Sequence, residues 1–259
     1  MSGPNGVPQG VLLDFGGVLV DVIHRPGGLR EVASDVAGLL SRSHVNSLRR
    51  DRIERDVRAG WKAYRDWKSG EGRRAFPREI GHREFWADFV AADWPTKARS
   101  VVEEHAYALC ERIDVATKDR PAKPDALETL KVLAARRIAL AVVSNALCGS
   151  GSRALVRSYG FEPLLAAQVY SDEIGLRKPN PRIFAAAASA IGVDLAACWY
   201  VGDQIDRDVL GGRRAGVGLV ILLPSRETGT GNDAVVEADA VIDSPKGLLS
   251  LLSSGSMTG

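Results

Sequence analysis

The second half of the chain alternates short apolar runs with amphipathic stretches, and this alternation constrains the fold more than any other feature. Apolar runs of strand length occupy residues 138–143, 167–170, 198–201, 217–223 and 240–242. Helical patterns lie between them or follow them, at 125–135, 152–159, 181–191, 206–215 and 246–252. Strands that are apolar along their whole length are typical of a parallel sheet buried on both faces. We therefore expect an α/β fold, to which residues 11–13 add one more buried strand.

The region between that first strand and residue 120 has a different texture. Charged residues are dense, and apolar residues recur at three- and four-residue spacing, as in 61–67, 85–90 and 101–113. This spacing predicts amphipathic helices, and no convincing strand lies among them. Residues 18–20 read as a second short strand, which would form a small hairpin with residues 11–13.

The predicted organisation is a core made of two separated pieces with a helical block between them. We expect the core to comprise residues 10–21 and 120–252, and a helical cap to comprise residues 22–119. Residues 1–9 and 253–259 are expected to be flexible tails. The fold class is thus α/β, with a Rossmann-like parallel sheet core, helices on both faces and an inserted all-helical cap domain. Ligands of open parallel sheets lie beyond the carboxyl ends of the strands, so the inserted block is expected to cover the site.

Composition and charge exclude several classes of partner. The net charge of +2 is too small to indicate nucleic acid as the main partner. The three cysteines are far apart and show no CxxC spacing, which argues against a disulfide framework and a zinc site and favours a reducing compartment. No apolar run approaches the roughly 18 residues of a membrane span. We expect a cytoplasmic protein with no membrane partner, and the oligomeric state stays open, with a homodimer as one alternative.

Polar residues follow four of the core segments at the places where a parallel sheet binds its ligand. Asp14 ends the first strand, Ser144 and Asn145 follow the second, Lys178 precedes the helix at 181–191, and Asp203 and Asp208 follow the strand at 198–201. A hydroxyl and loop N–H groups bind phosphate oxygens, and an ammonium lowers the pKa of a neighbouring carboxylate. Clustered carboxylates form an oxygen-rich site suited to Mg²⁺. A carboxylate is also a recognised covalent nucleophile for phosphoryl transfer.

These segments together resemble the four ordered motifs of the haloacid dehalogenase superfamily. The matching residues are Asp14-Phe15-Gly16-Gly17-Val18-Leu19, Ser144-Asn145, Lys178-Pro179 and Gly202-Asp203-x-x-x-x-Asp208. The segment from Gly211 to Gly216 is similar to the usual continuation of the fourth motif, and the helical block is similar to the α-helical cap inserted between the first two motifs. Each motif alone is weak evidence, but four in order are a specific signal.

The resemblance implies a role for each matching residue. Asp14 would attack phosphorus and become an aspartyl phosphate, and Lys178 would hold both the nucleophile and the phosphate. Ser144 would hold a phosphoryl oxygen, next to Asn145. The phosphate-binding set implied by the resemblance is Ser144, Asn145, Phe15, Gly16 and Lys178. The metal set is Asp14, the backbone carbonyl of Gly16, Asp203 and Asp208, with Mg²⁺ as the cofactor.

Gly16 is the one departure from the phosphatase pattern. Phosphatases of this superfamily usually carry a second Asp there, which protonates the leaving group, and general acid–base catalysis is worth roughly 10²–10⁴-fold. Asp21 and His24, in the loop leading to the helical block, are candidates to replace it. Some phosphatase-like members with Gly at this place act on sugar phosphates. Dehalogenases also lack the second Asp, but they typically have an aromatic residue there.

The sequence therefore predicts a Mg²⁺-dependent phosphatase of a small, sugar-phosphate-like metabolite. One alternative is a C–P bond hydrolase or dehalogenase-like enzyme, and the former would need a cap lysine, Lys62 or Lys68, that reaches the site to form a Schiff base. The other alternative is a catalytically weakened binding or regulatory protein, in which Gly16 marks lost activity. Trp61, Tyr64 and Trp67 form one helical stripe, which we expect to pack inside the cap, with a pocket lining as the alternative.

Overall fold

The fold is described from a computed structural model and covers residues 6–226, 228 and 236–255. Its centre is a six-stranded parallel sheet in the order β5-β4-β1-β6-β7-β8. The strands are β1 (Gly10–Leu13), β4 (Ala139–Ser144), β5 (Ala167–Tyr170), β6 (Cys198–Gly202), β7 (Leu219–Leu222) and β8 (Ala240–Val241). The chain places β4 and β5 on one side of β1 and β6 to β8 on the other, so the strand order reverses at β1. The predicted parallel sheet is confirmed.

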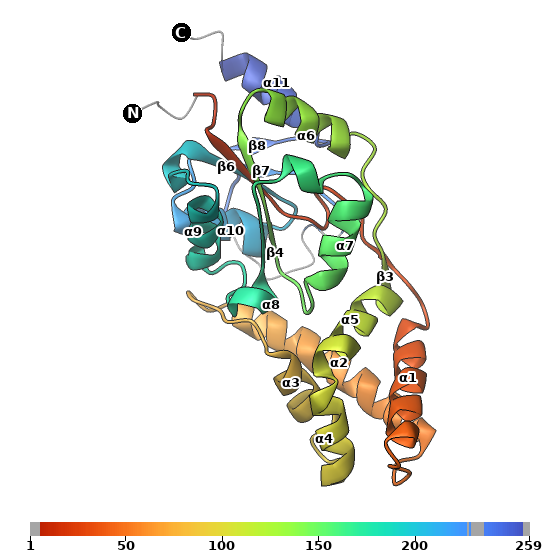
Figure 1. The fold of residues 1–259 in the computed structure, drawn as a ribbon. Helices are drawn as coiled ribbons and strands as arrows, with labels where there is room; N and C mark the ends of the chain where they lie inside the picture. The colour runs from red at the N-terminus through yellow and green to blue at the C-terminus, as the bar shows by residue number, and fades with distance from the viewer. Residues whose placement is uncertain (1–5, 227, 229–235, 256–259) are drawn as a thin grey trace.

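Helices cover both faces of this sheet (Figure 1). They are α6 (Ala126–Ala135), α7 (Ser150–Ser158), α8 (Ser171–Ile174), α9 (Pro181–Ala190), α10 (Leu210–Ala215) and α11 (Gly247–Gly255), with short 3₁₀ turns at Glu162–Leu164 and Leu195–Ala197 and a π-helical turn at Ile205–Val209. Val11 and Leu13 pack with α6, α7 and α11, whereas Leu12 packs with α9 on the opposite face. Successive strand residues thus enter different hydrophobic clusters, which explains why the strands are apolar throughout.

The segment between β1 and β4 is helical. It contains α1 (Gly28–Arg42), α2 (Arg50–Gly72), α3 (His82–Glu84), the π-helical Phe85–Val90, α4 (Thr96–Glu104) and α5 (Ala106–Thr117). We call these residues, 28–117, the helical insert. The insert is joined to the sheet by an antiparallel ribbon of β2 (Ile23–His24) and β3 (Lys118–Asp119). Its own hydrophobic cluster also takes in Leu147 and Cys148, from the loop after β4.

A second contact holds the insert against the core. Arg78 forms an isolated bridge with Leu176, and Glu79 N donates to Gly175 O at 2.9 Å. The buried Glu79 carboxylate accepts from Arg177 at 2.9 Å and from the Ser171 hydroxyl at 2.6 Å. The insert is therefore tied to the core at the β2–β3 ribbon and again at the residues just before α3.

The structure corrects three local predictions. Residues 18–20 are not a strand but part of a tight turn, in which the amides of Leu19 and Val20 both donate to Phe15 O. They are apolar because the turn is buried, not because it extends the sheet. The tails are also shorter than expected, since Gln9 is hydrogen-bonded to Ala197 and Ala139 across the sheet and α11 runs to Gly255. Residues 1–5 and 256–259 lie outside the described residues.

The helix predicted at 101–113 is two helices, because α4 ends at Glu104 and α5 begins at Ala106, with His105 between them outside helical geometry. None of the helices in the described part of the chain is both long and apolar enough to cross a membrane.

Candidate active site

Asp14 lies directly after β1, where the strand order reverses. Its amide donates to Val201 O of the neighbouring β6 at 2.9 Å, which fixes the backbone between the two strand ends. Its carboxylate is only 3% exposed, and Oδ1 accepts a hydrogen bond from Phe15 N at 2.7 Å. The Phe15 amide, which was predicted to bind phosphate, is thus engaged by Asp14.

Lys178 is shared by two carboxylates. Its ammonium lies 2.8 Å from Asp14 Oδ2 and 2.7 Å from Asp208 Oδ1, and all three side chains are buried. It also donates to the Tyr200 hydroxyl at 2.8 Å, and that hydroxyl in turn donates to Asp208 Oδ1 at 2.6 Å. Lys178 is therefore immobilised by three oxygens, one of which belongs to Asp14.

The shared ammonium separates the acidities of the two carboxylates. Burial raises the pKa of Asp14 to about 6, with Lys178 opposing the shift and Asp208 adding to it. Burial also acts on Asp208, but Lys178 and Arg207 outweigh it and hold the pKa of Asp208 at about 2. Asp208 is thus the ionised partner of Lys178 at neutral pH. The pKa of Asp14 is closer to neutral, so a charged group that binds beside it can change its protonation state.

Asp203 completes an acidic trio with Asp14 and Asp208. One oxygen from each carboxylate lies within 4.8 Å of the others. Asp203 Oδ2 accepts from the Ser225 hydroxyl at 2.6 Å, and Oδ1 lies 3.0 Å from the Arg207 guanidinium. Burial raises the pKa of Asp203, and Arg207 opposes that shift.

The trio fits a hard divalent cation. Three buried carboxylates face two cations, Lys178 and Arg207, so the cluster keeps an excess of negative charge. Oxygen ligands of this kind suit Mg²⁺. The Arg207 side chain is one-third exposed, so it has a route to solvent when a metal ion takes its place beside Asp203. Asp208 is less suited to direct coordination, because its oxygens already accept from Lys178, Tyr200 and the amides of residues 203 and 204.

The glycines after Asp14 allow this close packing. Gly17 has a positive φ of 79°, and a Cβ there would collide with the Asp203 carboxylate. Gly16 has an ordinary φ, and a Cβ at Gly16 would meet only Val22 Cγ2, at 3.1 Å. Position 17 therefore requires glycine, but position 16 has space for a larger residue after a small shift of Val22.

The predicted phosphate-binding residues at β4 divide into two kinds. Ser144, at the end of the strand, lines the cavity above Asp14. Asn145 instead accepts from Lys178 N at 2.7 Å and donates to Lys178 O at 3.0 Å. The Asn145 side chain therefore positions the Lys178 backbone with its oxygen and one N–H, while the residue also lines the cavity.

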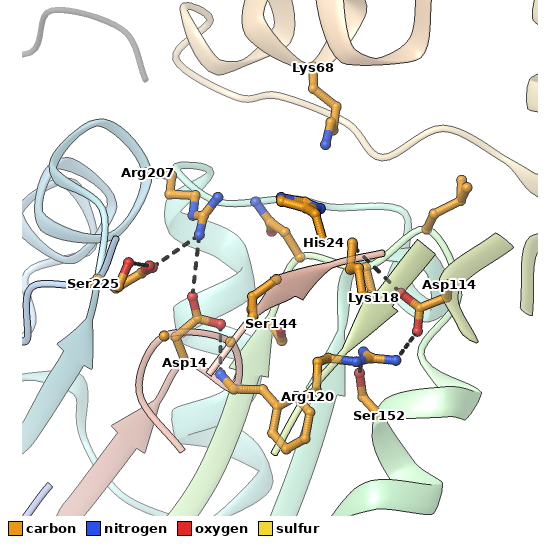
Figure 2. A pocket seen from close by; sticks show the side chains of 18 of the residues that line it. Asp14, His24, Lys68, Asp114, Lys118, Arg120, Ser144, Ser152, Arg207 and Ser225 are labelled. Carbon is orange, nitrogen blue, oxygen red and sulfur yellow. Dashed lines mark hydrogen bonds and ion pairs between the residues drawn. The ribbon is translucent and has the colours of Figure 1, made fainter. Parts of the chain in front are cut away.

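These groups open into one cavity of about 740 Å³ between the sheet and the insert (Figure 2). Asp14, Gly16, Ser144 and Asp203 line it from the sheet side. The insert and the β2–β3 ribbon form the opposite wall, and residues from them that line the cavity include Trp61, Tyr64, Lys68, His24 and Lys118. Asp14, Phe15, Gly16, Ser144, Asn145 and Asp203 of the predicted set thus line one partly open cavity whose size suits a small ligand, and Lys178 and Asp208 lie buried behind Asp14.

Comparison with known families decides which proteins share this arrangement. A family model described as a haloacid dehalogenase-like hydrolase matches residues 8–216. The chain belongs to the haloacid dehalogenase-like hydrolases. The resemblance inferred from the four motifs is confirmed.

Three curated relatives of this haloacid dehalogenase-like chain carry phosphatase names. A glyceraldehyde 3-phosphate phosphatase of Methanopyrus kandleri is 38% identical over 94 residues, which are 36% of this chain and 40% of that protein. A phosphoglycolate phosphatase of Caulobacter vibrioides is 33% identical over 176 residues, 64% of this chain and 70% of that protein. A phosphoserine phosphatase of Thermus thermophilus is 33% identical over 114 residues, 44% of this chain and 45% of that protein. The chain thus spans less than half of two of these relatives.

Solved structures of the family share the fold. A 2-haloacid dehalogenase from Pseudomonas syringae pv. tomato DC3000 has a TM-score of 0.60 at 20% identity, with 94% of this chain and 97% of that one covered. A phosphatase from Thermococcus onnurineus has a TM-score of 0.55 at 17% identity, with the same coverage of both chains. At this identity the likeness shows the fold alone.

Within this family member, sequence analysis missed two residues of the site. Tyr200 lies in the apolar run of β6 and reads as a core aromatic, yet its hydroxyl bonds Lys178 and Asp208. Arg207 reads as a surface charge, yet it lies 3.0 Å from Asp203 and 3.9 Å from Asp14. The available signal was its position, four residues after Asp203 and one before Asp208.

The two candidates for the missing acid both line the cavity. Asp21 is paired with Lys123 at 2.9 Å, so it must leave that ion pair before it donates a proton. His24 is on β2, in the wall opposite Asp14 (Figure 2). The aromatic stripe of α2 both lines the cavity and packs inside the insert. Trp61 and Tyr64 line the cavity, whereas Trp67 stacks on Tyr64 within the insert, with 6.1 Å between the ring centres.

Proposed function

We propose that the chain is a phosphatase of a small phosphorylated metabolite and that it acts through an aspartyl phosphate on Asp14. The observation that carries this proposal is the position of the Asp14 carboxylate, at the floor of the cavity and 2.8 Å from a buried ammonium. Membership of the family and the phosphatase names of the relatives support the same reaction class. The insert and the β2–β3 ribbon that joins it to the sheet, residues 22–119 together, act as a cap over the cavity.

The proposed reaction has two displacements at phosphorus. A carboxylate oxygen of Asp14 forms a bond to phosphorus, and the bond between phosphorus and the ester oxygen breaks, so the leaving oxygen takes the electron pair and needs a proton. Water then attacks the aspartyl phosphate at phosphorus, which regenerates Asp14 and releases inorganic phosphate. Lys178 balances charge on the phosphoryl oxygens, and the Ser144 hydroxyl donates to one of them.

Mg²⁺ is the cofactor that the acidic trio suits. Asp14, Asp203 and the Gly16 carbonyl would hold it, and Asp208 would support the site through Lys178 and the loop amides rather than as a direct ligand. When bound, the metal neutralises negative charge on the phosphoryl group. A metal ion beside Asp203 would displace Arg207, whose side chain is one-third exposed, towards solvent.

A phosphate-ester screen with and without Mg²⁺ tests the proposal. We expect turnover that is lost on chelation, lost in Asp14→Asn and retained in a surface control such as Lys131→Met, whose ammonium is half-exposed and pairs with the exposed Glu128. Beryllium fluoride or labelled phosphate should modify Asp14 alone. Activity in Asp14→Asn would exclude the covalent mechanism, and a folded protein without any turnover would favour the binding-protein alternative.

A C–P bond hydrolase remains the second candidate because one of its two candidate lysines reaches the cavity. Lys68 lines it, and burial lowers the pKa of this ammonium to about 7, which makes its amine available near neutral pH. Lys62 is excluded, since it is 78% exposed and paired with Asp66 at 2.7 Å. Borohydride reduction in the presence of a phosphonate aldehyde should label Lys68 if this alternative holds and leave it unlabelled if the phosphatase proposal holds.

A further inference from the structure

The cavity wall opposite Asp14 carries a lysine whose charge is not balanced by a carboxylate. Trp61, Tyr64 and Lys68 follow one another on α2 at spacings of three and four residues, and all three line the cavity. Lys68 is half-buried, and its Nζ lies 4.8 Å from the centre of the Tyr64 ring. Figure 2 shows its ammonium pointing from the insert into the cavity. Within residues 6–226, 228 and 236–255, no carboxylate is ion-paired with Lys68.

The surroundings of Lys68 disfavour a lone positive charge. Burial is the main cause that lowers the pKa of Lys68 to about 7. The nearby cations Lys118, Arg177 and Arg207 add to the shift, and Glu79, which is ion-paired with Arg177, opposes it less strongly. A partly desolvated ammonium among like charges is unfavourable until an anion joins it. Such a group in a cavity indicates a ligand-binding role more often than a structural one.

The neighbouring cations do not all have their own counter-ions. Arg177 is neutralised by Glu79, 2.9 Å away. Lys118 and Arg120, however, share the single carboxylate of Asp114, with Lys118 at 3.6 Å. Among the described residues that line the cavity, lysines and arginines outnumber aspartates seven to four, and Lys68 and Lys118 bring two of these positive charges to the wall opposite Asp14.

We propose that Lys68 and Lys118 form a second anion subsite, which binds a carboxylate or a second phosphate group of the substrate. The inference rests on the proposed phosphatase function, in which Asp14 holds the phosphoryl group at the other end of the cavity. The substrate class is then a phosphomonoester that carries a second anionic group, rather than a neutral sugar phosphate. The cavity of about 740 Å³ has room for both groups of a small metabolite.

The same helix supplies a matched control. Lys62 lies six residues before Lys68 on α2, but its ammonium is paired with Asp66 at 2.7 Å and is largely exposed. Replacement of either lysine by methionine removes one positive charge and keeps most of the side-chain volume. The two variants therefore differ in whether the lost charge faced the cavity.

The test compares substrates that differ only in the second group. One pair is 2-phosphoglycolate and 2-hydroxyethyl phosphate, and the other is the bisphosphate and monophosphate of 1,3-propanediol. In at least one pair, we expect the wild type to have at least a tenfold higher kcat/KM for the more anionic substrate, mainly because its KM is lower. The pair that shows this preference identifies the second group as a carboxylate or a phosphate. Lys68→Met should reduce this preference about ten- to hundredfold, as expected for a charged hydrogen bond. Lys68→Arg should keep part of the preference, and Lys62→Met should keep all of it.

Two results overturn the subsite: a wild type without preference in either pair, or a preference in Lys68→Met within twofold of the wild-type value. Calorimetry on the Asp14→Asn background separates this inference from the phosphatase proposal. If no phosphomonoester is hydrolysed, the phosphatase proposal fails, but the subsite still requires Lys68→Met to weaken 2-phosphoglycolate binding at least tenfold more than 2-hydroxyethyl phosphate binding. Equal weakening of both overturns it.

Discussion

Lys178 is the residue on which the charge balance of the site depends, since it holds one oxygen of Asp14 and one of Asp208. We predict that Lys178→Met raises the pKa of Asp14 above its present value of about 6, because the ammonium that favours the carboxylate is lost. Breaking a buried ion pair should also destabilise the fold by about 3 kcal/mol. Carbon NMR titration of the metal-free protein measures the first effect, and denaturant unfolding measures the second. An unchanged Asp14 pKa would mean that Lys178 does not control the nucleophile.

In the proposed reaction, Gly16 has no side chain that could protonate the leaving group. The backbone φ of Gly16 is ordinary, and a Cβ there would require only a small shift of Val22 Cγ2, which would be 3.1 Å away. We predict that Gly16→Asp speeds the hydrolysis of alkyl phosphates by up to about 10²-fold, the low end of general acid catalysis, and flattens the dependence of rate on leaving-group pKa. A leaving-group series measures both effects.

Gly16→Asn is the matched control, because it fills the same space without an acidic proton and should leave that dependence steep. If Asp21 already supplies the proton, Asp21→Asn should slow chiefly the poor leaving groups. Wild-type behaviour in Gly16→Asp and Asp21→Asn alike would show that proton transfer does not limit the rate.

The residues at strand ends could be predicted from the sequence, but those that connect them could not. Asp14, Lys178 and Asp208 meet as expected, because all the strands of the parallel sheet have their carboxyl ends at the same edge. Tyr200 was hidden, since a tyrosine in an apolar strand looks the same whether its hydroxyl is bonded or not. The contacts of Arg207 and Lys68 depend on rotamer and helix orientation, which the spacing of apolar residues does not define.

At the scale of elements, periodicity predicted which segments are helices or strands and failed where burial alone explains an apolar run. Residues 18–20 are as apolar as a strand, but they form a turn in which the amides of Leu19 and Val20 donate to Phe15 O. The strands of the sheet were predictable because both faces of each are covered, which leaves a continuous apolar run. The β2–β3 ribbon could not be predicted, because each of its strands has only two residues, all exposed or half-buried, and two residues are too few to show an alternating pattern.

The short helix α3 adds a pH-dependent contact between the insert and the core. His82 Nε2 lies 3.4 Å from Asp172 Oδ2, and the interaction with this carboxylate is the main cause that raises the pKa of His82 to about 10. Because the folded pKa exceeds the ordinary value near 6.5, the stabilisation is complete below about pH 6.5 and is lost as the pH rises towards 10.

We predict that a double-mutant cycle of His82→Gln and Asp172→Asn gives a coupling of about 1.5 kcal/mol at pH 6, which declines steadily up to pH 10. Denaturant unfolding at a series of pH values measures it. A coupling that is constant across this range would contradict a charged His82.

At the scale of the whole molecule, the buried Glu79–Arg177 pair fastens the insert to the core. The Glu79 side chain is fully buried, and its partners Arg177 and Ser171 come from the core. We predict that Glu79→Gln lowers the free energy of unfolding by about 3 kcal/mol, because the guanidinium stays buried without its counter-charge. The rate of amide hydrogen exchange at residues 77–82 should increase in the same variant.

Glu128→Gln is the surface control for that variant, since Glu128 is 72% exposed and its loss should change stability by less than about 0.5 kcal/mol. Equal effects of the two substitutions would show that the Glu79 contact does not hold the insert in place.

The central position of β1 has a consequence for how the protein is made. The ribosome completes β1 first, but its neighbours begin only at Ala139 and Cys198, so the second neighbour follows roughly 10–40 seconds later at usual rates of translation. The insert is continuous in sequence and supplies most of its own hydrophobic cluster. We therefore expect it to fold before β1 has either of its neighbouring strands to pair with. Chains stalled before Cys198 should therefore protect the insert from protease while the segment around Asp14 is still cut, and simultaneous protection of both would refute this order. Asp14, the proposed nucleophile, therefore leaves the ribosome well before the residues of β4 and β6 that complete its surroundings.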